Sequence, residues 1–202
     1  GSVLLFTGAG LLITLLVQSS SATIALTMVM CHNGWISYEA AAAMVLGENI
    51  GTTVTANIAA IIANRSAKRL ALGHTFFNIF GVVWMMVFFH FFVRLSAQAA
   101  ILITGYSPFN NPEAVPAGLS VFHTGFNIIN TLILAGLIPQ YKKLLENVIP
   151  LRPNEKKNFR LRYFRPGFMS MSGIGLLQAR EEILLFGKHV AGMFSLIPEY
   201  LI

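Results

Sequence analysis

Polar and apolar residues in this chain segregate into long blocks. Four apolar blocks run from about Val3 to Met30, Tyr38 to Ala63, Leu70 to Val93 and Ala117 to Tyr141. The last two hold about 24 residues each, or about 36 Å of helix, which is enough to cross a hydrocarbon core of about 30 Å. The pattern predicts an all-α, polytopic membrane protein whose transmembrane domain covers residues 1–141.

Three links separate these blocks. The first two, His32-Asn33-Gly34 and Asn64-Arg65-Ser66, are short and carry turn-forming residues. The longest link runs from Arg94 to Pro116 and includes Ser107-Pro108 and Asn111-Pro112. Short links predict that consecutive blocks lie side by side.

The basic residues predict an orientation for the blocks. Arg65, Lys68 and Arg69 lie in one link, and eight of the 14 Lys and Arg residues fall between positions 142 and 165. The link between the third and fourth blocks holds only Arg94. Because two spans between the basic segments return the chain to the same side, both segments are predicted to be cytoplasmic, with residues 142–165 forming a basic linker.

Composition supports a bilayer as the solvent of this chain. Of its 202 residues, 55% are hydrophobic and only 11% are charged, whereas soluble domains carry about 25% charged residues. The basic strip lies beside an apolar block and lacks the aromatic platforms of a nucleic-acid site, so no nucleic-acid partner is predicted. Cys31 is the only cysteine, which excludes a disulfide within the chain.

The first block is interrupted in its middle by Gln18-Ser19-Ser20-Ser21. One interpretation is a re-entrant hairpin of two half-helices, about 15 and about 10 residues long, with the polar tip at mid-membrane. The alternative is a single tilted span that unwinds locally. Neither the length of the block nor its periodicity decides between them.

The second block carries a polar break of its own. Gly47 and Gly51 flank Glu48-Asn49-Ile50, and both glycines weaken helix propensity within an otherwise apolar run. This pattern predicts a broken helix, with half-helices at about 38–46 and 52–63.

The two breaks share one chemistry. Half-helix N-termini favour an anion, and hydroxyls and unwound carbonyls suit a hard cation such as sodium. Residues 1–63 contain no Lys or Arg, so an anion here would be held by dipoles, hydroxyls and co-bound cations. The alternative is that Ser and Thr bond back to their helices and that Gly serves close packing. Glu48 favours a site, because an ionised acid at the centre of a span costs at least about 2.5–3.5 kcal/mol unless compensated.

A second motif repeats in the third and fourth blocks. His-Thr-x-Phe-Asn-Ile occurs at residues 74–79 and again at 123–128, in spans predicted to run in opposite directions. Each copy places a His and an Asn four residues apart on one helix face. The motif predicts polar side chains that support the breaks, and the alternative is bonding between helices. No acid or cysteine lies at metal-ligand spacing beside them.

The chain changes character after Pro166. Ser172 to Leu196 shows an amphipathic pattern that is too polar to span a membrane. It predicts either the first helix of a soluble domain or an interfacial helix, and thus a short cytoplasmic helical tail.

Several of these motifs together resemble the sodium/phosphate cotransporter family. They are Gln-Ser-Ser-Ser-Ala-Thr at 18–23, Gly-Glu-Asn-Ile-Gly-Thr-Thr-Val-Thr-Ala at 47–56, Asn-Arg-Ser-Ala-Lys-Arg-Leu-Ala at 64–71 and the two His-Thr-x-Phe-Asn motifs. The resemblance covers roughly residues 3–140. It implies one half of an inverted-repeat transporter, since members carry two Gln-Ser-Ser-Ser repeats and this chain has one, similar to the second. It also implies that residues 166–202 begin a PhoU-like domain.

The resemblance further implies roles for individual residues. The residues implied to contact substrate are Gln18, Ser19, Ser20, Ser21, Asn49, Thr52 and Thr53. The implied sodium ligands are Ser19, Ser21, Asn49 and Thr52. The implied supporting residues are Glu48, His74, Asn78, His123 and Asn127.

These expectations define a leading function and an alternative. The leading function is sodium-coupled transport of inorganic phosphate by alternating access in a bacterial inner membrane. A missing first repeat, or a second copy of the chain, would supply the other half of the site. The alternative is a non-transporting membrane module that docks a regulatory domain through residues 142–165. An enzyme is not expected, because no paired aspartates, His-Glu-x-x-His or Gly-x-Ser-x-Gly pattern occurs.

Overall fold

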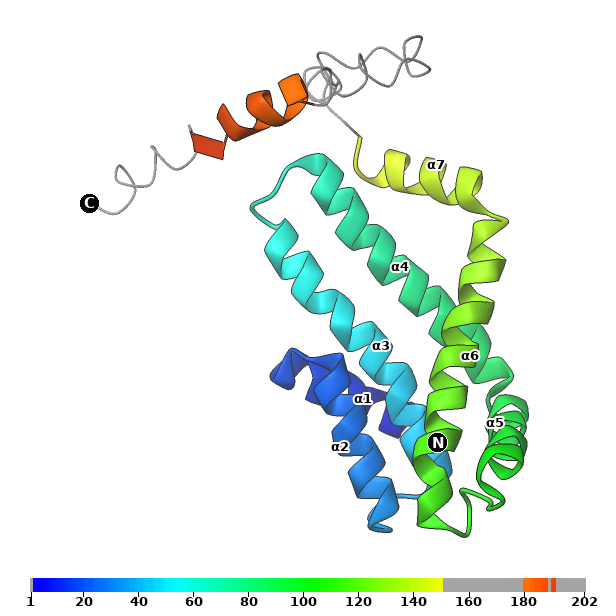
Figure 1. Cartoon of the computed structure of the whole chain (residues 1–202). Helices are drawn as coiled ribbons and strands as arrows, with labels where there is room; N and C mark the ends of the chain where they lie inside the picture. Colours follow the sequence, from blue (N-terminus) through cyan, green and yellow to red (C-terminus); the bar gives the residue numbers. More distant parts are fainter. Residues whose placement is uncertain (1, 151–179, 189, 192–202) are drawn as a thin grey trace. The chain divides into compact units, whose positions relative to one another are not determined.

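The computed structural model describes residues 2–150, 180–188 and 190–191 (Figure 1). The chain divides into two compact units, residues 1–151 and residues 152–202. In the second unit the described residues are helical. The remainder of the amphipathic helix predicted for Ser172 to Leu196 lies outside the described residues, as does the basic segment beyond position 150.

The first unit is all-helical over its described residues. Its elements are α1 (Ser2–Val17), α2 (Ser20–His32), α3 (Tyr38–Ala60), α4 (Arg65–Val87), α5 (Phe89–Thr104), a 3₁₀ turn η1 (Pro112–Ala114), α6 (Val115–Ala135) and α7 (Ile138–Val148). The all-α prediction is confirmed for these residues.

The polar break of the first block separates α1 from α2 at the predicted position. Gln18 has φ 57°, in the left-handed region that ends a helix for a residue with a side chain. Ser19 has extended backbone, and its hydroxyl accepts a hydrogen bond from the Ala22 backbone N–H at 3.4 Å, so it caps α2. Whether the pair forms a re-entrant hairpin in a bilayer stays a prediction.

The broken helix predicted for the second block is wrong, because α3 is continuous from Tyr38 to Ala60. Its glycines serve close packing instead. A Cβ on Gly47 would overlap the carbonyl oxygen of Thr7, and one on Gly51 would lie 2.7 Å from the Cβ of Thr14. The missing side chains let α1 pack directly against the backbone of α3.

Helix α3 forms the centre of the bundle. Every residue from Ala40 to Glu48 is buried, and four consecutive alanines at 40–43 keep this part of the helix narrow. It contacts α1, α2, α4 and α6, so residues on its different faces meet four separate helices. This central position lets one polar segment of α3 face several neighbours at once.

The third block has different bounds from those predicted. Helix α4 begins at Arg65 and ends at Val87, and a second helix, α5, covers Phe89–Thr104. The stretch from Arg94 to Thr104 is therefore helical rather than part of a link. Phe89, Val93 and Ala97 are buried at helical spacing, and α5 packs against α6. Sequence reasoning missed this amphipathic face beside the strongly apolar block.

The fourth block divides into α6 and α7, so the span predicted to reach Tyr141 is wrong at its C-terminal end. The chain turns at Gly136 and Leu137, and Pro139 lies in the first turn of α7. Proline disfavours helical backbone at the residue before it and is well placed at a helix start. The basic segment that was predicted to begin at position 142 starts inside α7.

Within the part of the chain that the structure describes, two helical segments are long and apolar enough to cross a membrane. They are Arg65–Val87 and Pro112–Ala135, and α1, α2 and α5 are shorter apolar helices. Large apolar side chains are exposed on several helices, with Leu16 of α1 79% and Leu102 of α5 88% exposed. Such extensive apolar exposure is typical of surfaces that face lipid or another protein.

The basic link before α4 and the end of α7 lie together. Arg65 donates a hydrogen bond to the Pro150 carbonyl and Arg69 to the Ile149 carbonyl, each at 2.6 Å. Arg69 also lies 3.7 Å from a carboxylate oxygen of Glu146. The start of α4 and the described part of the second basic segment therefore lie at one end of the first unit.

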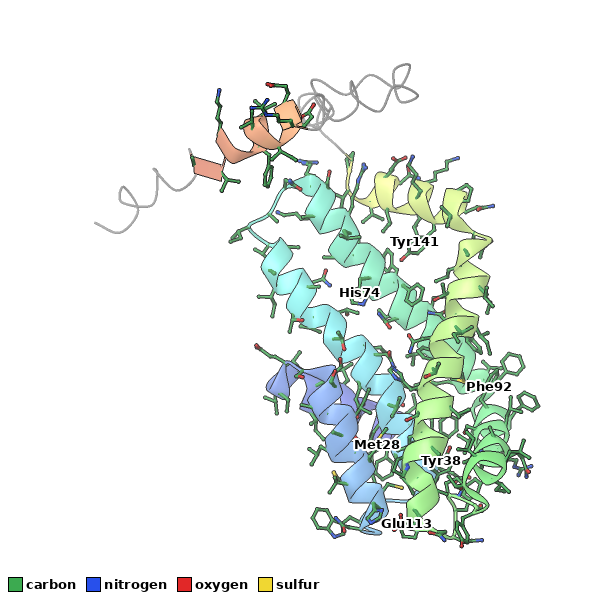
Figure 2. The ribbon with its side chains drawn as sticks, in the orientation of Figure 1. Met28, Tyr38, His74, Phe92, Glu113 and Tyr141 are labelled. Atoms are coloured by element: carbon green, nitrogen blue, oxygen red, sulfur yellow. The ribbon has the colours of Figure 1, made fainter. Side chains whose placement is uncertain are left out.

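Tyr141 adds a contact between α7 and α4 (Figure 2). Its hydroxyl donates to the carbonyl of Gly73. Burial raises the pKa of this hydroxyl, so it remains a protonated donor.

Candidate functional site: a polar pocket among α2, α3, α4 and α6

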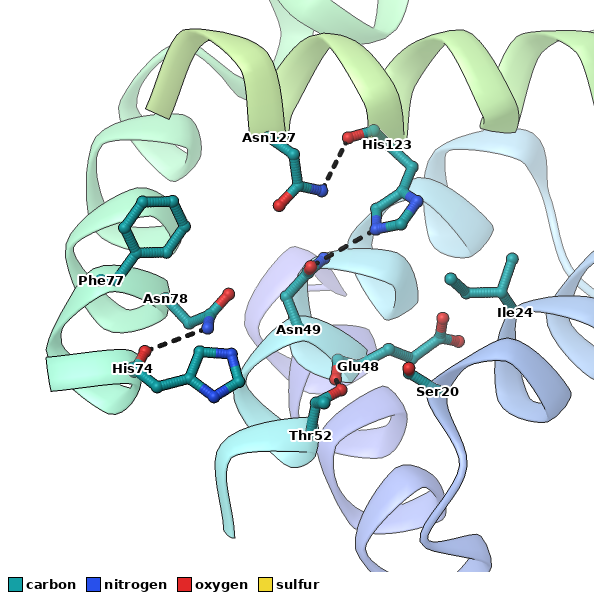
Figure 3. Close-up of a pocket in the computed structure, with 10 residues that line it drawn as sticks. All are labelled: Ser20, Ile24, Glu48, Asn49, Thr52, His74, Phe77, Asn78, His123 and Asn127. Carbon is teal, nitrogen blue, oxygen red and sulfur yellow. Dashed lines mark hydrogen bonds between the residues drawn. The ribbon is translucent and has the colours of Figure 1, made fainter. Parts of the chain in front are cut away.

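A polar cavity of about 150 Å³ lies where four helices meet (Figure 3). Its walls come from α2, α3, α4 and α6, which are far apart in the sequence. The lining residues are Ser20, Ile24, Glu48, Asn49, Thr52, His74, Phe77, Asn78, His123 and Asn127.

Helix α3 contributes three polar residues to the cavity, Glu48, Asn49 and Thr52. The Asn49 amide nitrogen donates to the Val45 carbonyl at 2.8 Å, and the Thr52 hydroxyl donates to the Glu48 carbonyl at 2.8 Å. These bonds to the preceding turn fix both side chains. They use one of the two amide N–H donors of Asn49 and leave the oxygens of Asn49 and Thr52 free to accept.

The two His-Thr-x-Phe-Asn-Ile motifs meet at this cavity from two different helices, α4 and α6. Asn78 donates to the His74 carbonyl at 3.0 Å on α4, and Asn127 donates to the His123 carbonyl at 2.9 Å on α6. Each asparagine keeps a second N–H donor. The motifs thus present equivalent groups to one cavity, with His and Asn side by side on each helix.

One hydrogen bond joins the motif of α6 to the polar segment of α3. The Nε2 atom of His123 lies 3.4 Å from the Asn49 side-chain oxygen (Figure 3). If Nε2 carries the proton, it donates to this oxygen and orients the Asn49 amide. Within the first unit, the His123 side chain is half-buried and the His74 side chain is exposed.

Glu48 is the most buried polar group of the cavity. Its side chain is 0% exposed, and Oε1 accepts a hydrogen bond of 2.6 Å from the Thr27 hydroxyl on α2. Oε2 is buried and has no hydrogen-bond partner among the described residues. An acceptor that is buried in this way calls for a cation, a proton or a water molecule.

The lining residues could hold an oxyanion without a fixed positive charge. None of them is Lys or Arg. Their free donors are amide N–H groups, imidazole N–H groups and the hydroxyl of Ser20, because the Thr52 hydroxyl already donates to the Glu48 carbonyl. The carbonyl, hydroxyl and carboxylate oxygens of the same walls fit a hard cation such as sodium, which takes oxygen ligands.

Eight of the twelve residues implied at the sequence level line the cavity, and four do not. Gln18, Ser19 and Ser21 are exposed in the turn and first turn of α2, where Ser19 acts as the cap. Thr53 is buried, and its hydroxyl donates to the Ile50 carbonyl at 2.8 Å. Of the Gln-Ser-Ser-Ser segment, Ser20 reaches the cavity.

Three residues of the site escaped sequence reasoning. Ile24 and Phe77 form apolar parts of the wall, and Thr27 binds the Glu48 carboxyl group. Helical spacing could have indicated Ile24 and Thr27, because they follow Ser20 by four and seven positions on one face of α2. Phe77 could have been found from its place inside the His-Thr-x-Phe-Asn motif.

Comparison with known proteins identifies the family of this chain. The sequence model of the family described as Na+/Pi-cotransporter matches residues 3–130, which include all of the lining residues. The chain therefore belongs to the Na+/Pi-cotransporter family. This family and the relatives below that have functional names are transporters, so the chain is not an enzyme.

Individual relatives cover different parts of the chain. The protein YqeW of Bacillus subtilis is 30% identical over 71% of this chain and 43% of its own length. The Escherichia coli protein named "Putative inorganic phosphate export protein YjbB" is 23% identical over 96% of this chain and 34% of its own length. The rat protein named "Sodium-dependent phosphate transport protein 2B" is 41% identical over 41% of this chain and 12% of its own length.

The chain spans less than half the length of each of these relatives. No solved structure matches it.

Proposed function

We propose that this chain carries out sodium-coupled transport of inorganic phosphate across a cell membrane, and that the polar cavity is its share of the substrate site. The observation that carries the proposal is the meeting of both His-Thr-x-Phe-Asn-Ile motifs with the Glu-Asn-Ile-Gly-Thr segment at one cavity. Membership of the Na+/Pi-cotransporter family and the names of two relatives support phosphate as substrate.

Phosphate would be bound by neutral donors. The second amide N–H groups of Asn49, Asn78 and Asn127 and the hydroxyl of Ser20 would donate to its oxygens, with His123 orienting Asn49. Without a fixed cation, the dianion would need a co-bound positive charge to offset the loss of its hydration. Cation coupling is therefore part of the binding mechanism that we propose.

The cavity would be completed by a second, equivalent half. The family resemblance implies an inverted repeat, and a missing first repeat or a second copy of the chain would contribute matching groups across it. Alternating access would then be a rocking of the two halves around the bound ions. Family membership does not favour the alternative of a non-transporting docking module.

Phosphate flux into proteoliposomes tests the proposal. The protein in its full natural length should take up labelled phosphate when sodium, but not choline, forms the inward gradient. Asn49→Ala and His123→Ala should each lower sodium-dependent flux at subsaturating phosphate about 10-fold or more, because each removes a hydrogen bond to a charged group or its orienting partner, worth about 1.5–3 kcal/mol.

His90→Ala is the matched control. His90 is an exposed histidine on α5 that does not line the cavity, so its replacement should leave flux unchanged. Flux that persists equally in choline would refute sodium coupling. Flux that is insensitive to Asn49→Ala and His123→Ala would remove the cavity from the transport path.

A further inference from the structure

The Glu48 carboxylate occupies an unusual position in the cavity. Its side chain is fully buried, Oε1 is held by the Thr27 hydroxyl at 2.6 Å, and Oε2 has no partner among the described residues. The single bond to Thr27 fixes the carboxylate plane and leaves the second oxygen available. A buried acceptor of this kind is normally satisfied by a ligand or a cation.

The surroundings of Glu48 contain oxygens and lack fixed positive charge. Ser20, Asn49 and Thr52 line the same cavity, and the Ser20 hydroxyl makes no hydrogen bond to a residue that the structure describes. No Lys or Arg lies in residues 1–63 or in the cavity wall. Carboxylate, hydroxyl and amide oxygens at one small cavity are a donor set for a hard, weakly charged cation.

Charge also favours a cation beside the Glu48 carboxylate when an anion is bound. A phosphate anion in this cavity would face the Glu48 carboxylate, and two like charges a few ångströms apart in a low-dielectric site repel strongly. A cation bound to the carboxylate offsets this repulsion, because it satisfies Oε2 and presents positive charge to the anion.

We propose that Glu48 is a direct ligand of a sodium ion and that Thr27 positions its carboxylate for this role. The inference rests on the proposed function for the identity of the anion, but sodium binding itself does not require phosphate. The proposed ligand differs from those that the sequence resemblance implies, which include Ser19 and Ser21. These two residues do not line the cavity.

Sodium-dependent thermal stabilisation tests the site without measuring transport. The protein in its full natural length, purified in detergent without phosphate, is melted at fixed pH while sodium chloride replaces choline chloride at constant ionic strength. A ligand that binds the folded state raises the melting temperature as its concentration passes its Kd. The wild-type melting temperature should rise with sodium and stay constant in choline.

Glu48→Gln keeps the shape of the side chain and removes its charge, so it should abolish the rise. Glu39→Gln is the matched control, because Glu39 is an exposed carboxylate in the first turn of the same helix. It should keep the full rise. Thr27→Val retains the carboxylate but removes its orienting bond, and should shift the midpoint to sodium concentrations about 10-fold higher.

The outcomes separate the sodium site from the transport function. A wild-type protein without a sodium-dependent rise, or a Glu48→Gln variant that keeps it, would overturn the site. If Glu48→Gln does not fold, an unchanged midpoint in Thr27→Val would overturn it. Absence of phosphate flux together with a Glu48-dependent rise would refute the proposed function alone, and flux with a Glu48-independent rise would refute the sodium site alone.

Discussion

Asn130 joins α6 to α4 through both ends of its amide. Its nitrogen donates to the Phe77 carbonyl at 3.0 Å, and its oxygen accepts from the Trp84 indole N–H at 3.1 Å. The side chain is 0% exposed. This pair of bonds holds the two helices that carry the His-Thr-x-Phe-Asn-Ile motifs, so it sets the width of the cavity from outside it.

Asn130→Ala should therefore destabilise the protein. It leaves the Trp84 N–H without its partner and opens a small cavity, at a cost of about 1–3 kcal/mol. Thermal unfolding in detergent should show a lower melting temperature. Asn147→Ala, at an exposed position of α7, is the control and should have little effect. Equal melting temperatures for the two variants would contradict the proposed link.

At the scale of single residues, the sequence indicated the kind of polar chemistry in the cavity better than it indicated which residues line the cavity. The repeated motif, Glu48 and Asn49 could be singled out because polar groups are costly in apolar spans. The sequence could not show which Ser of the Gln-Ser-Ser-Ser segment reaches the cavity, because this depends on the direction of α2 after the turn at Gln18.

Among the elements, the packing of α1 against α3 depends on glycine. Gly10 and Gly47 approach the backbone of the opposite helix so closely that a Cβ on either would overlap a carbonyl oxygen. Because backbone atoms cannot rotate away, the helices would have to separate. The same contact positions Glu48 and Asn49, the residues that follow Gly47.

Gly47→Ala should lower the free energy of unfolding by about 1–3 kcal/mol, the usual cost of overpacking. Gly125→Ala is the matched control, since Gly125 lies within α6 and a Cβ there would meet nothing within 4 Å. It should be neutral or stabilising by up to about 1 kcal/mol through helix propensity. Chemical denaturation of both variants checks this, and a neutral Gly47→Ala would contradict direct backbone packing.

A second contact between elements fastens α7 to α4. Arg69 donates to the Ile149 carbonyl and lies beside Glu146, while Tyr141 donates to the Gly73 carbonyl. A cation at the last carbonyls of a helix is favourable because these groups carry partial negative charge. These bonds link α7 to the helix that contributes His74 and Asn78 to the cavity.

Arg69→Gln should loosen α7. Loss of the charged bond, worth about 1–2 kcal/mol, should speed hydrogen exchange of the α7 amides about 10-fold. Lys68→Gln is the control, because it removes a nearby positive charge but no bond to α7 that is seen in the described part of the chain. Hydrogen exchange of the α7 amides should be unchanged in this variant. Similar acceleration in both variants would argue against a specific Arg69 contact.

At the scale of the whole molecule, the basic segments define one end of the first unit. Arg65 and Arg69 contact the end of α7, whereas the link before α6 lies at the opposite end of α4 and α6 (Figure 1). This arrangement fits two spans, Arg65–Val87 and Pro112–Ala135. The excess of positive charge predicts that the α7 end is cytoplasmic.

Labelling of single cysteines in intact cells checks the orientation. In a Cys31→Ser background, a membrane-impermeant maleimide should label Asn110→Cys from outside and leave Ser66→Cys and Asn147→Cys unlabelled until the cells are opened. All three positions are exposed or at the surface of the first unit. Labelling of Ser66→Cys from outside would reverse the predicted orientation, and labelling of all three would refute the two spans.

The sequence by itself determined the all-α class of the described residues, the break at Gln18 and Ser19 and the polar motifs. These features depend on local propensity, on charge and on the cost of polar groups in an apolar environment. Only the tertiary structure decided that α3 is unbroken, because Gly47 can either end a helix or admit a neighbouring backbone, and the approach of α1 selects the second. Tertiary contact likewise brought Thr27 to Glu48 and His123 to Asn49, since both pairs join helices whose packing no local pattern specifies.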